Sequence, residues 1–515
     1  MAAHSALFWS NEPPALPVPP IAFFNPLGLP MSRRLLSLQT FAAALVAISC
    51  SSSALADNWA HWRGPTGNGT APDATPPTNW SDSENIAWKV EIPGRGSGSP
   101  IVWEDKVFVS TAVKTAAPET ASSTEPAQNP SSQRPSSQRP SSQRPSSQRP
   151  SSQRPSSQRP GGFGGPSGGR RGGGFGRPAG PLPELAFHLM CFERSTGKLL
   201  WDQLATTAKP HEGTHSTNGY ASGSPCTDGE HVYAYFGSRG LFCYTLDGKL
   251  VWQRDFGDMT KRAGFGEGSS PTLAGDKIIV PWDHEGPSAI YALDKRTGKE
   301  LWKTDRDEPT CWATPLIVSV GDKHQVIMNG QTRARAYDLE TGQELWSCGG
   351  QTQRPVASAV SNGELVLVGS GFRGAFLGAF RPDGKGNLAG TKSVAWSVDR
   401  DTPDIASPLL SGNRLYFHKG KSGIITCLDA STGQEIFPAA RVPGINSTYA
   451  SPVAAGGFVY LTGRRGTTVV IRDSDTFEVI SENDLGEPVD ATPAIADHQI
   501  FIRGENHLYC IRSDK

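Results

Sequence analysis

Short apolar runs alternate with tight polar turns along most of this chain. In one copy of the pattern, a turn at 275–277 precedes an apolar run at 278–282, and a second run covers 288–293. The turn at 294–299 follows, and the run at 300–302 ends on Trp302. Such short runs, bounded by Gly and Asp and rich in β-branched and aromatic residues, predict β-strands joined by tight turns.

The same pattern recurs with a regular spacing. Seven copies begin at a Ser-Pro or Thr-Pro pair and one at Ser358-Ala359, and from Ser224 onward the starts are 41 to 49 residues apart. The eight starts are Ser99, Ser224, Ser270, Thr314, Ser358, Ser407, Ser451 and Thr492. This period is typical of propeller blades with four short strands each. The sequence therefore predicts an all-β, eight-bladed β-propeller of four-stranded antiparallel blades.

The ends of the pattern indicate how the ring closes. The last copy, 492–513, supplies only three strands, whereas the segment 86–91 reads as an outer strand with its own Trp88. We expect this N-terminal strand to complete the eighth blade and to remove the open sheet edges.

Aromatic residues end the outer strands of most copies. We expect them to pack between neighbouring blades, where each ring buries about 150 to 250 Å², and not to stack on a cofactor. They are Trp88, Trp201, Trp252, Trp302, Trp346, Trp396 and Phe437.

The frame Asp-x-x-Thr-Gly-x-x-x-Trp, as in 294–302 and 338–346, resembles the repeat of pyrroloquinoline-quinone (PQQ) type β-propellers. That family contains quinoprotein alcohol dehydrogenases and the outer-membrane assembly lipoprotein BamB. The segments 58–65 and 86–96 resemble the openings of exported PQQ-like propellers of planctomycete-type bacteria. The resemblance covers about 380 residues in eight copies and implies the fold more strongly than the function.

The first 56 residues read as a leader. Arg33 and Arg34 precede an apolar run at 35–48 and the small residues 54–56, which predicts a secretory signal peptide over 31–56. That run is too short for a membrane span of about 20 residues. Two variants stay open: a lipobox, with peripheral membrane attachment through Cys50, and a twin-arginine signal at 32–36. We expect export to the periplasm or association with the outer membrane.

Gly and Pro concentrate in one segment of low complexity. Six Ser-Ser-Gln-Arg-Pro copies fill 131–160, and a Gly-rich stretch follows to 180. We predict a disordered insertion over 111–186 that interrupts the first blade, with the propeller spanning 57–110 and 187–515. The insertion holds ten basic against three acidic residues, so the zero net charge of the chain hides an acidic propeller. We interpret the insertion as a tolerated repeat expansion, with adhesion to a polyanion as the alternative.

The cysteines and the balanced net charge limit the cofactors and partners that the sequence predicts. Apart from Cys50 there are seven cysteines, an odd number, which we interpret as small buried residues. The dehydrogenases in the family use an adjacent-cysteine disulfide and a calcium ion held by Glu, Asn and Asp. No Cys-Cys pair occurs here, so we predict no cofactor and keep PQQ with calcium as the alternative. A balanced net charge also argues against a nucleic-acid partner.

Candidate ligand residues lie in the connections expected on one face of the propeller. His211 to His215 spells His-Glu-x-x-His, but Pro210 and Gly213 oppose the helix that a zinc protease needs, so no metal site is predicted. A shared site for His211, His215 and His284 stays open. The candidates are His211, Glu212, His215, Glu267, Asp283, His284, Glu285, Trp312 and Arg354.

Basic residues recur between the second and third strands of the copies. Solvated charges are the simple interpretation, and a cationic ring for an anionic ligand or partner is the alternative. They are Arg239, Arg333, Arg373, Lys419, Lys421, Arg464, Arg465 and Arg503. The sequence favours an exported, monomeric, non-catalytic binding or scaffold protein whose partner is an envelope protein or a small anionic ligand.

Overall fold

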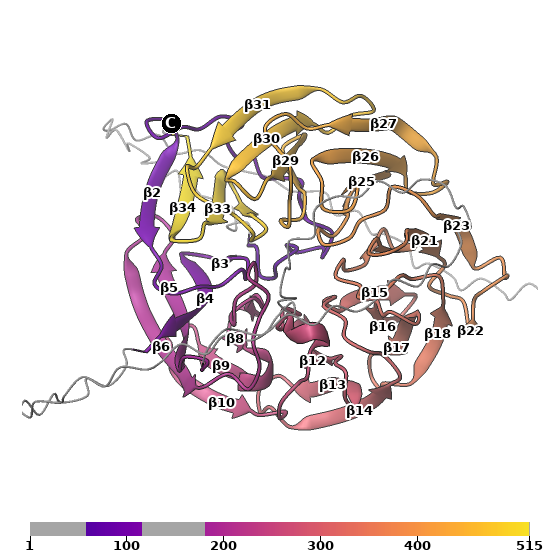
Figure 1. The fold of residues 1–515 in the computed structure, drawn as a ribbon, viewed down its shortest axis with the longest axis horizontal. Helices are drawn as coiled ribbons and strands as arrows, with labels where there is room; N and C mark the ends of the chain where they lie inside the picture. The colour runs from indigo at the N-terminus through magenta and orange to yellow at the C-terminus, as the bar shows by residue number, and fades with distance from the viewer. Residues whose placement is uncertain (1–57, 116–180, 514–515) are drawn as a thin grey trace, which may run out of the picture. The chain divides into compact units, whose positions relative to one another are not determined.

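Eight antiparallel sheets stand around a central axis in the computed structural model, which describes residues 58–115 and 181–513 (Figure 1). Each sheet is one blade, and its four main strands run from the axis to the rim in the order in which they hydrogen-bond. The described residues contain two short 3₁₀ turns, η1 (Gly237–Arg239) and η2 (Arg262–Gly264), and no helix long and apolar enough to cross a membrane. The eight-bladed, all-β prediction is confirmed.

We number the blades along the chain and give their strands from the inside outward. Blade 1 holds β3 (Ile101–Trp103), β4 (Lys106–Lys114), β5 (Leu185–Glu193) and β6 (Leu199–Ala208). Blade 2 holds β7 (Cys226–Thr227), β8 (His231–Tyr235), β9 (Leu241–Thr245) and β10 (Leu250–Arg254). Blade 3 holds β11 (Thr272–Ala274), β12 (Lys277–Trp282), β13 (Ser288–Asp294) and β14 (Glu300–Arg306). Blade 4 holds β15 (Leu316–Val320), β16 (Lys323–Met328), β17 (Ala334–Asp338) and β18 (Glu344–Cys348).

The second half of the ring repeats this arrangement. Blade 5 holds β19 (Val360–Ser361), β20 (Val366–Ser370), β21 (Phe376–Phe380) and β23 (Val394–Val398). Blade 6 holds β24 (Leu409–Ser411), β25 (Arg414–His418), β26 (Ile424–Asp429) and β27 (Glu435–Arg441). Blade 7 holds β28 (Val453–Ala455), β29 (Phe458–Thr462), β30 (Thr467–Arg472) and β31 (Val479–Asp484). Two short extra strands pair in parallel: β1 (Thr70–Ala71) with β28, and β22 (Gly386–Asn387) with β18.

Blade 8 joins the two ends of the propeller. Its inner strands are β32 (Ala494–Ala496), β33 (Gln499–Arg503) and β34 (His507–Arg512), and its outer strand is β2 (Ile86–Glu91). β2 pairs antiparallel with β34, with Trp88 opposite Cys510. The predicted closure by the N-terminal strand is therefore confirmed.

The repeated turn frame shows why the sequence needs both its Thr-Gly pair and its Trp. In blade 3, Asp294 Oδ1 accepts hydrogen bonds from the backbone N–H and the hydroxyl of Thr297, which lowers the pKa of Asp294. Gly298 has φ +69°, and a Cβ there would lie 2.6 Å from the ring of Trp252 in blade 2. The indole N–H of Trp252 donates to Lys295 O in the same turn. The turn of one blade is thus built around the aromatic ring of the preceding blade.

The other blade aromatics occupy equivalent or related places. Trp88, Trp201, Trp302 and Trp396 each donate their indole N–H to a backbone carbonyl at the turn of the next blade. Trp346 is fully buried and donates to Gln325, and Phe437 packs on Phe477 of blade 7. The structure places these rings between blades.

The low-complexity segment falls in the connection between β4 and β5. β4 continues to Lys114 and β5 begins at Leu185, so both strands extend into the range 111–186. Residues 116–180, the leader and Cys50 lie outside the described residues, and the predictions made for them stay predictions. The seven described cysteines are free and buried.

The segment 58–71 crosses one end of the axis, and we call it the crosspiece. Trp59 exchanges backbone hydrogen bonds with Val102 of blade 1, and Asn68 bonds to Ser361 of blade 5. Arg63 donates to Pro408 O and Pro452 O at the inner ends of blades 6 and 7. The crosspiece therefore ties together blades on opposite sides of the axis.

Candidate functional site

A closed belt of hydrogen bonds surrounds the axis where the eight blades meet. The backbone N–H of each Ser or Thr that starts a blade donates to the hydroxyl of the next one, over 2.8 to 3.1 Å. The last bond, from Thr492 N to Ser99 Oγ, closes the circle. The belt consists of Ser99, Ser224, Ser270, Thr314, Ser358, Ser407, Ser451 and Thr492. Ser and Thr suit these starts because each has a short side chain whose hydroxyl oxygen can accept this bond.

The belt hydroxyls keep their own hydrogens free for another partner. Each belt residue is at most 5% exposed, and none of the eight hydroxyls donates to a protein acceptor within the described residues. All eight line one cavity of about 520 Å³ on the axis, which we call the cup. Eight buried residues with O–H groups thus line a space inside the protein, and buried donors normally have partners.

The wall above the belt differs from one side of the cup to the other. The wall residues lie two positions before each belt residue, and blades 4 to 7 contribute Trp312, Val356, Ile405 and Tyr449. The opposite wall consists of Asp490, Ser97, Ser222 and Gly268. One side is therefore apolar and partly aromatic, and the other is small and polar.

The crosspiece closes the cup at one end. Trp62 lines the cup and also a second cavity of about 230 Å³ that the crosspiece shares with the blades. Arg63 next to it is 2% exposed, and its guanidinium donates to the backbone carbonyls of Asn68, Pro408 and Pro452. Burial lowers the pKa of Arg63 to about 9. A Cβ at Gly69, where φ is +86°, would lie 2.4 Å from this guanidinium, so the position needs glycine.

Three cations stand over the apolar side of the cup. Arg354 lies 3.3 Å from Asp404 and 3.6 Å above the ring of Phe372, while its Nε is buried without a partner. Burial lowers the pKa of Arg354 and raises that of Asp404. Arg373 and Lys421 line the same side and form no ion pair with any described carboxylate. Arg354 and Arg373 have φ +47° and +54°, a strained conformation for residues other than glycine.

The acidic groups in the cup are already occupied. Glu267 accepts from the backbone N–H and the hydroxyl of Ser238, at 2.7 and 2.5 Å. Asp490 forms a two-bond ion pair with Arg464, whose guanidinium lies 4.0 Å from the ring of Tyr449. The charges left without partners in the cup are therefore positive.

His215 lines the cup as a neutral group. Its Nδ1 lies 2.8 Å from the hydroxyl of Thr217, and its ring packs edge-on against Phe265. Burial and the nearby cations Lys421, Arg354 and Arg464 lower the pKa of His215. At neutral pH it adds no positive charge to the cup.

The structure separates the nine predicted ligand residues. His215, Glu267, Trp312 and Arg354 line the cup. His211 and Glu212 line a small neighbouring cavity, and His284 and Glu285 line an open cavity outside blade 3. Asp283 is 3% exposed and paired with Arg306.

The three histidines considered as a shared site line three different cavities. The stretch around His211 and His215 is not helical, and no group of three or more His, Cys, Asp or Glu that could hold a metal occurs in 58–115 and 181–513. The oxygens of Glu267 and Asp490 accept bonds from protein groups, as does Asn218 Oδ1. The cup therefore does not present the free Glu, Asn and Asp oxygens that the resemblance implies for calcium beside PQQ.

The predicted ring of cations is not continuous. Arg239, Arg333, Lys419 and Arg464 pair with carboxylates, and Arg503 is buried and donates to Ser110 O. Arg373 and Lys421 are the two members that line the cup. Seven of the eight cations lie between the second and third strands, as the regular spacing predicted, whereas Arg503 ends β33, and local carboxylates pair with four of the eight.

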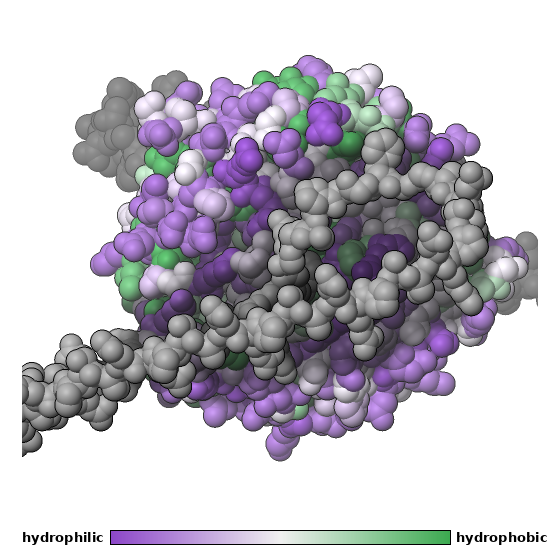
Figure 2. All heavy atoms as spheres, in the orientation of Figure 1, coloured by the Kyte–Doolittle hydropathy of each residue, from purple (hydrophilic) through white to green (hydrophobic). Residues whose placement is uncertain are grey.

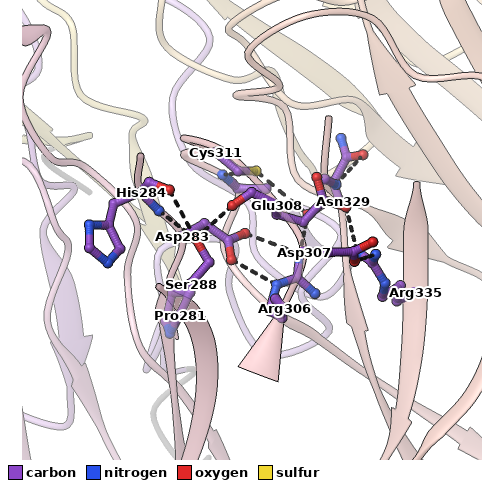
Figure 3. A network of polar contacts seen from close by, with 12 residues as sticks. Pro281, Asp283, His284, Ser288, Arg306, Asp307, Glu308, Cys311, Asn329 and Arg335 are labelled. Atoms are coloured by element: carbon purple, nitrogen blue, oxygen red, sulfur yellow. Dashed lines mark hydrogen bonds and ion pairs between the residues drawn. The ribbon is translucent and has the colours of Figure 1, made fainter. Parts of the chain in front are cut away.

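A second polar network lies between blades 3 and 4 (Figure 3). The Asp283 carboxylate and the Arg306 guanidinium, both buried, meet over 2.7 and 3.1 Å, and Arg306 also donates to Tyr337 OH. Glu308, also buried, accepts from Thr332 and Arg335. These groups satisfy one another, so we assign the network to blade packing.

Sequence reasoning missed three kinds of cup residue. The belt hydroxyls were used only to mark blade starts, although their regular spacing was the available signal. Trp62 lies outside the repeats, and Phe265 and Phe372 sit in loops without periodicity. In the space-filling view of Figure 2, the described surface is mostly hydrophilic and is hollowed near the middle of the ring of blades.

Comparisons with known proteins agree with this architecture. A family model described as outer membrane protein assembly factor BamB matches residues 187–438 and 290–515. BamB of Bordetella pertussis is 30% identical over 232 residues, which cover 43% of this chain and 54% of that protein. The chain thus spans about half the length of this relative.

Two solved structures show how far the likeness extends in three dimensions. The quinohemoprotein alcohol dehydrogenase of Comamonas testosteroni aligns with a TM-score of 0.51 at 9% identity, covering 89% of this chain and 81% of that one. BamB of Moraxella catarrhalis aligns with a TM-score of 0.44 at 12% identity, covering 64% and 93%. At 9% identity, the likeness to the dehydrogenase concerns the fold alone.

Proposed function

Because the chain belongs to the PQQ-like β-propeller family whose model is described as outer membrane protein assembly factor BamB, we propose that it is an exported, non-catalytic scaffold protein of the cell envelope. Its role is then comparable to that of BamB, and its partner is an envelope protein. The leader predicted over 31–56 supports export.

Exposed apolar side chains on the outer strands of three adjacent blades support a partner-binding surface. Leu199 and Leu204 on β6 are 45% and 54% exposed, and Leu250 and Val251 on β10 are 47% and 43% exposed. Leu301 on β14 is 47% exposed. We infer that these side chains together form one apolar interaction surface, because contiguous exposed apolar patches mark interaction sites. We call these five residues the rim group.

The backbone at the rim can also bind a strand. In blade 4 the outer edge of β18 is covered by β22, which pairs with it in parallel, and Trp346 beneath is fully buried. β6 has ten residues and pairs only with β5 in the described chain. We infer that an extended segment of the partner docks along β6, by the same strand addition that the chain performs on itself at β18.

The test is partner recovery from the native envelope. The full-length protein is crosslinked in cells, the main crosslinked envelope protein is identified, and its affinity is then measured with both proteins purified. The double variant Leu204→Glu/Leu250→Glu should weaken binding at least tenfold, because it places charges at the apolar contact. The matched control is Val479→Glu, an exposed apolar residue on β31 of blade 7. Equal affinity of both variants would refute the rim surface.

The alternative, a PQQ-dependent dehydrogenase, rests on fold likeness and on the family resemblance. Adding PQQ and calcium to the purified protein and recording its absorbance separates the two proposals. We expect no bound quinone spectrum, and a stoichiometric one would favour the dehydrogenase.

A further inference from the structure

We propose that the cup binds a sugar acid, a hydroxyl-rich ring compound that carries a carboxylate. The site lies on the axis, away from the rim group, so this inference stands apart from the partner surface. It rests on the donors, the charges, the aromatic rings and the size of the cup.

The belt hydroxyls favour a ligand with many hydrogen-bond acceptors. Eight hydroxyls, each in a residue at least 95% buried, offer hydrogens that no described protein group accepts. A small apolar ligand would leave these donors without partners, at a free-energy cost for each. The hydroxyls and ring oxygen of a sugar can accept from several of them at once.

The three cations call for a negative charge on one side of that ligand. Arg354, Arg373 and Lys421 come from blades 4 to 6, and two of them have no carboxylate partner. The buried Nε of Arg354 is also free. A carboxylate placed here would make charge-assisted hydrogen bonds, which are about twice as strong as neutral ones. The strained backbone at Arg354 and Arg373 is a feature that clusters at binding sites.

The aromatic rings favour a ligand that has an apolar face. Trp62, Phe265, Trp312, Phe372 and Tyr449 all line the cup and are partly exposed. The C–H face of a sugar ring can bury apolar surface against such rings while its hydroxyls point at the belt. Inorganic phosphate has the charge but lacks this face, and a neutral sugar has the face but lacks the charge.

The dimensions fit such a ligand. A volume of about 520 Å³ lies within the usual range of about 300 to 1,000 Å³ for small-molecule pockets. The crosspiece blocks the far end, so the ligand would enter and leave through one mouth. The polar wall of Ser97, Ser222 and Asp490 faces the cations across this space.

Calorimetric titration of the full-length protein tests the proposal, with D-glucuronate, glucose and inorganic phosphate as probes. We expect glucuronate to bind, and glucose and phosphate to bind at least tenfold more weakly. Absence of glucuronate binding overturns the proposal. Phosphate or glucose binding as tightly as glucuronate overturns the assignment to a sugar acid.

Variants then locate the site. Lys421→Ala and Arg373→Ala should each weaken glucuronate binding about tenfold, because each removes an exposed cation from the mouth. Ile405→Trp should abolish binding by filling the cup without removing a hydrogen bond. Arg465→Ala is the control, since this exposed cation does not line the cup. Glucuronate binding that survives all three cup variants places the ligand elsewhere and refutes the site.

The two proposals fail separately. The Leu204→Glu/Leu250→Glu variant should bind glucuronate normally, and Lys421→Ala should bind the envelope partner normally. Failure of the wild-type protein to bind glucuronate, with an intact partner complex, would overturn only the sugar-acid site. Absence of an envelope partner, with intact glucuronate binding, would overturn only the proposed function.

Discussion

The two ends of the propeller axis hold an arginine in different ways: Arg63 is buried, and Arg354 is partly exposed. At the closed end, Arg63 makes three hydrogen bonds of 2.6 to 2.8 Å to backbone carbonyls of the crosspiece and of blades 6 and 7. At the open end, Arg354 has one weak ion pair of 3.3 Å and a left-handed backbone, and the Nε of each of the two arginines is buried without a partner. Both terminal guanidinium nitrogens of Arg63 bond within the fold, whereas only one of Arg354 does, which leaves Arg354 the more available to a ligand.

Position relative to the belt separates these roles. The belt is the same on all eight blades, whereas the segments on either side of it differ. The crosspiece supplies carbonyls and packing at one end, and unequal loops supply cations and aromatic rings at the other. The structural residues therefore gather at one end of the axis and the proposed binding residues at the other, and this difference is larger than the difference between blades.

The largest effect should come from breaking the closed end. Arg63→Ala leaves three carbonyls without their donor, and each buried unpaired group costs about 1 to 3 kcal/mol. We expect the free energy of unfolding to fall by about 3 kcal/mol or more in chemical denaturation. Arg465→Ala, an exposed control, should change it little. A loss below about 1 kcal/mol for Arg63→Ala would mean that the crosspiece does not stabilise the ring.

Acid should weaken both ends together. Burial lowers the pKa of His61 in the crosspiece and of His418 at the end of β25 to about 4, and Arg63 adds to the effect at His61. Both histidines stay neutral in the folded protein, whereas in the unfolded chain they take up protons near pH 6.5. This stability is therefore complete above pH 6.5 and is lost as the pH falls towards 4.

At pH 5 the loss should be about 2 kcal/mol for each histidine. His61→Gln should flatten the fall in the unfolding free energy between pH 6.5 and 5, measured by denaturation at each pH. An unaltered slope for His61→Gln would contradict the prediction.

The smallest effect on stability should come from the open end. Arg373→Gly removes a cation but also relieves a backbone at φ +54°. Because glycine tolerates this conformation and costs some entropy, we expect the free energy of unfolding to change by less than about 1 kcal/mol. Glucuronate affinity should nevertheless fall. A stability loss as large as that of Arg63→Ala would contradict the prediction that the open end contributes little to stability.

The fold was predictable because one frame repeats eight times. The Thr-Gly turn, the outer-strand Trp and the Ser/Thr-Pro start each have a local physical cause, and repetition makes each visible without an alignment. Even the closure by β2 followed, since seven complete copies and one incomplete copy require a strand from elsewhere.

The cup was only partly predictable because its specificity lies where the repeats differ. Trp312 and Arg354 were expected in the loops, but His211, Asp283 and His284 from the same kind of loop lie elsewhere. Periodicity shows on which face a loop lies and not how deep its side chains reach. Trp62 comes from outside the repeats, and no spacing rule connects it to the axis.

All belt bonds have the same direction, because the backbone N–H of one blade donates to the hydroxyl of the following blade. The last of them, from Thr492 N to Ser99 Oγ, joins blade 8 to blade 1. The belt is therefore closed only when the chain extends through Thr492. A chain that stops before Thr492 leaves the Ser451 N–H without an acceptor and the Ser99 hydroxyl without its donor. A truncated chain would therefore lack two belt hydrogen bonds at the centre of the propeller, whether or not a partner or ligand is bound.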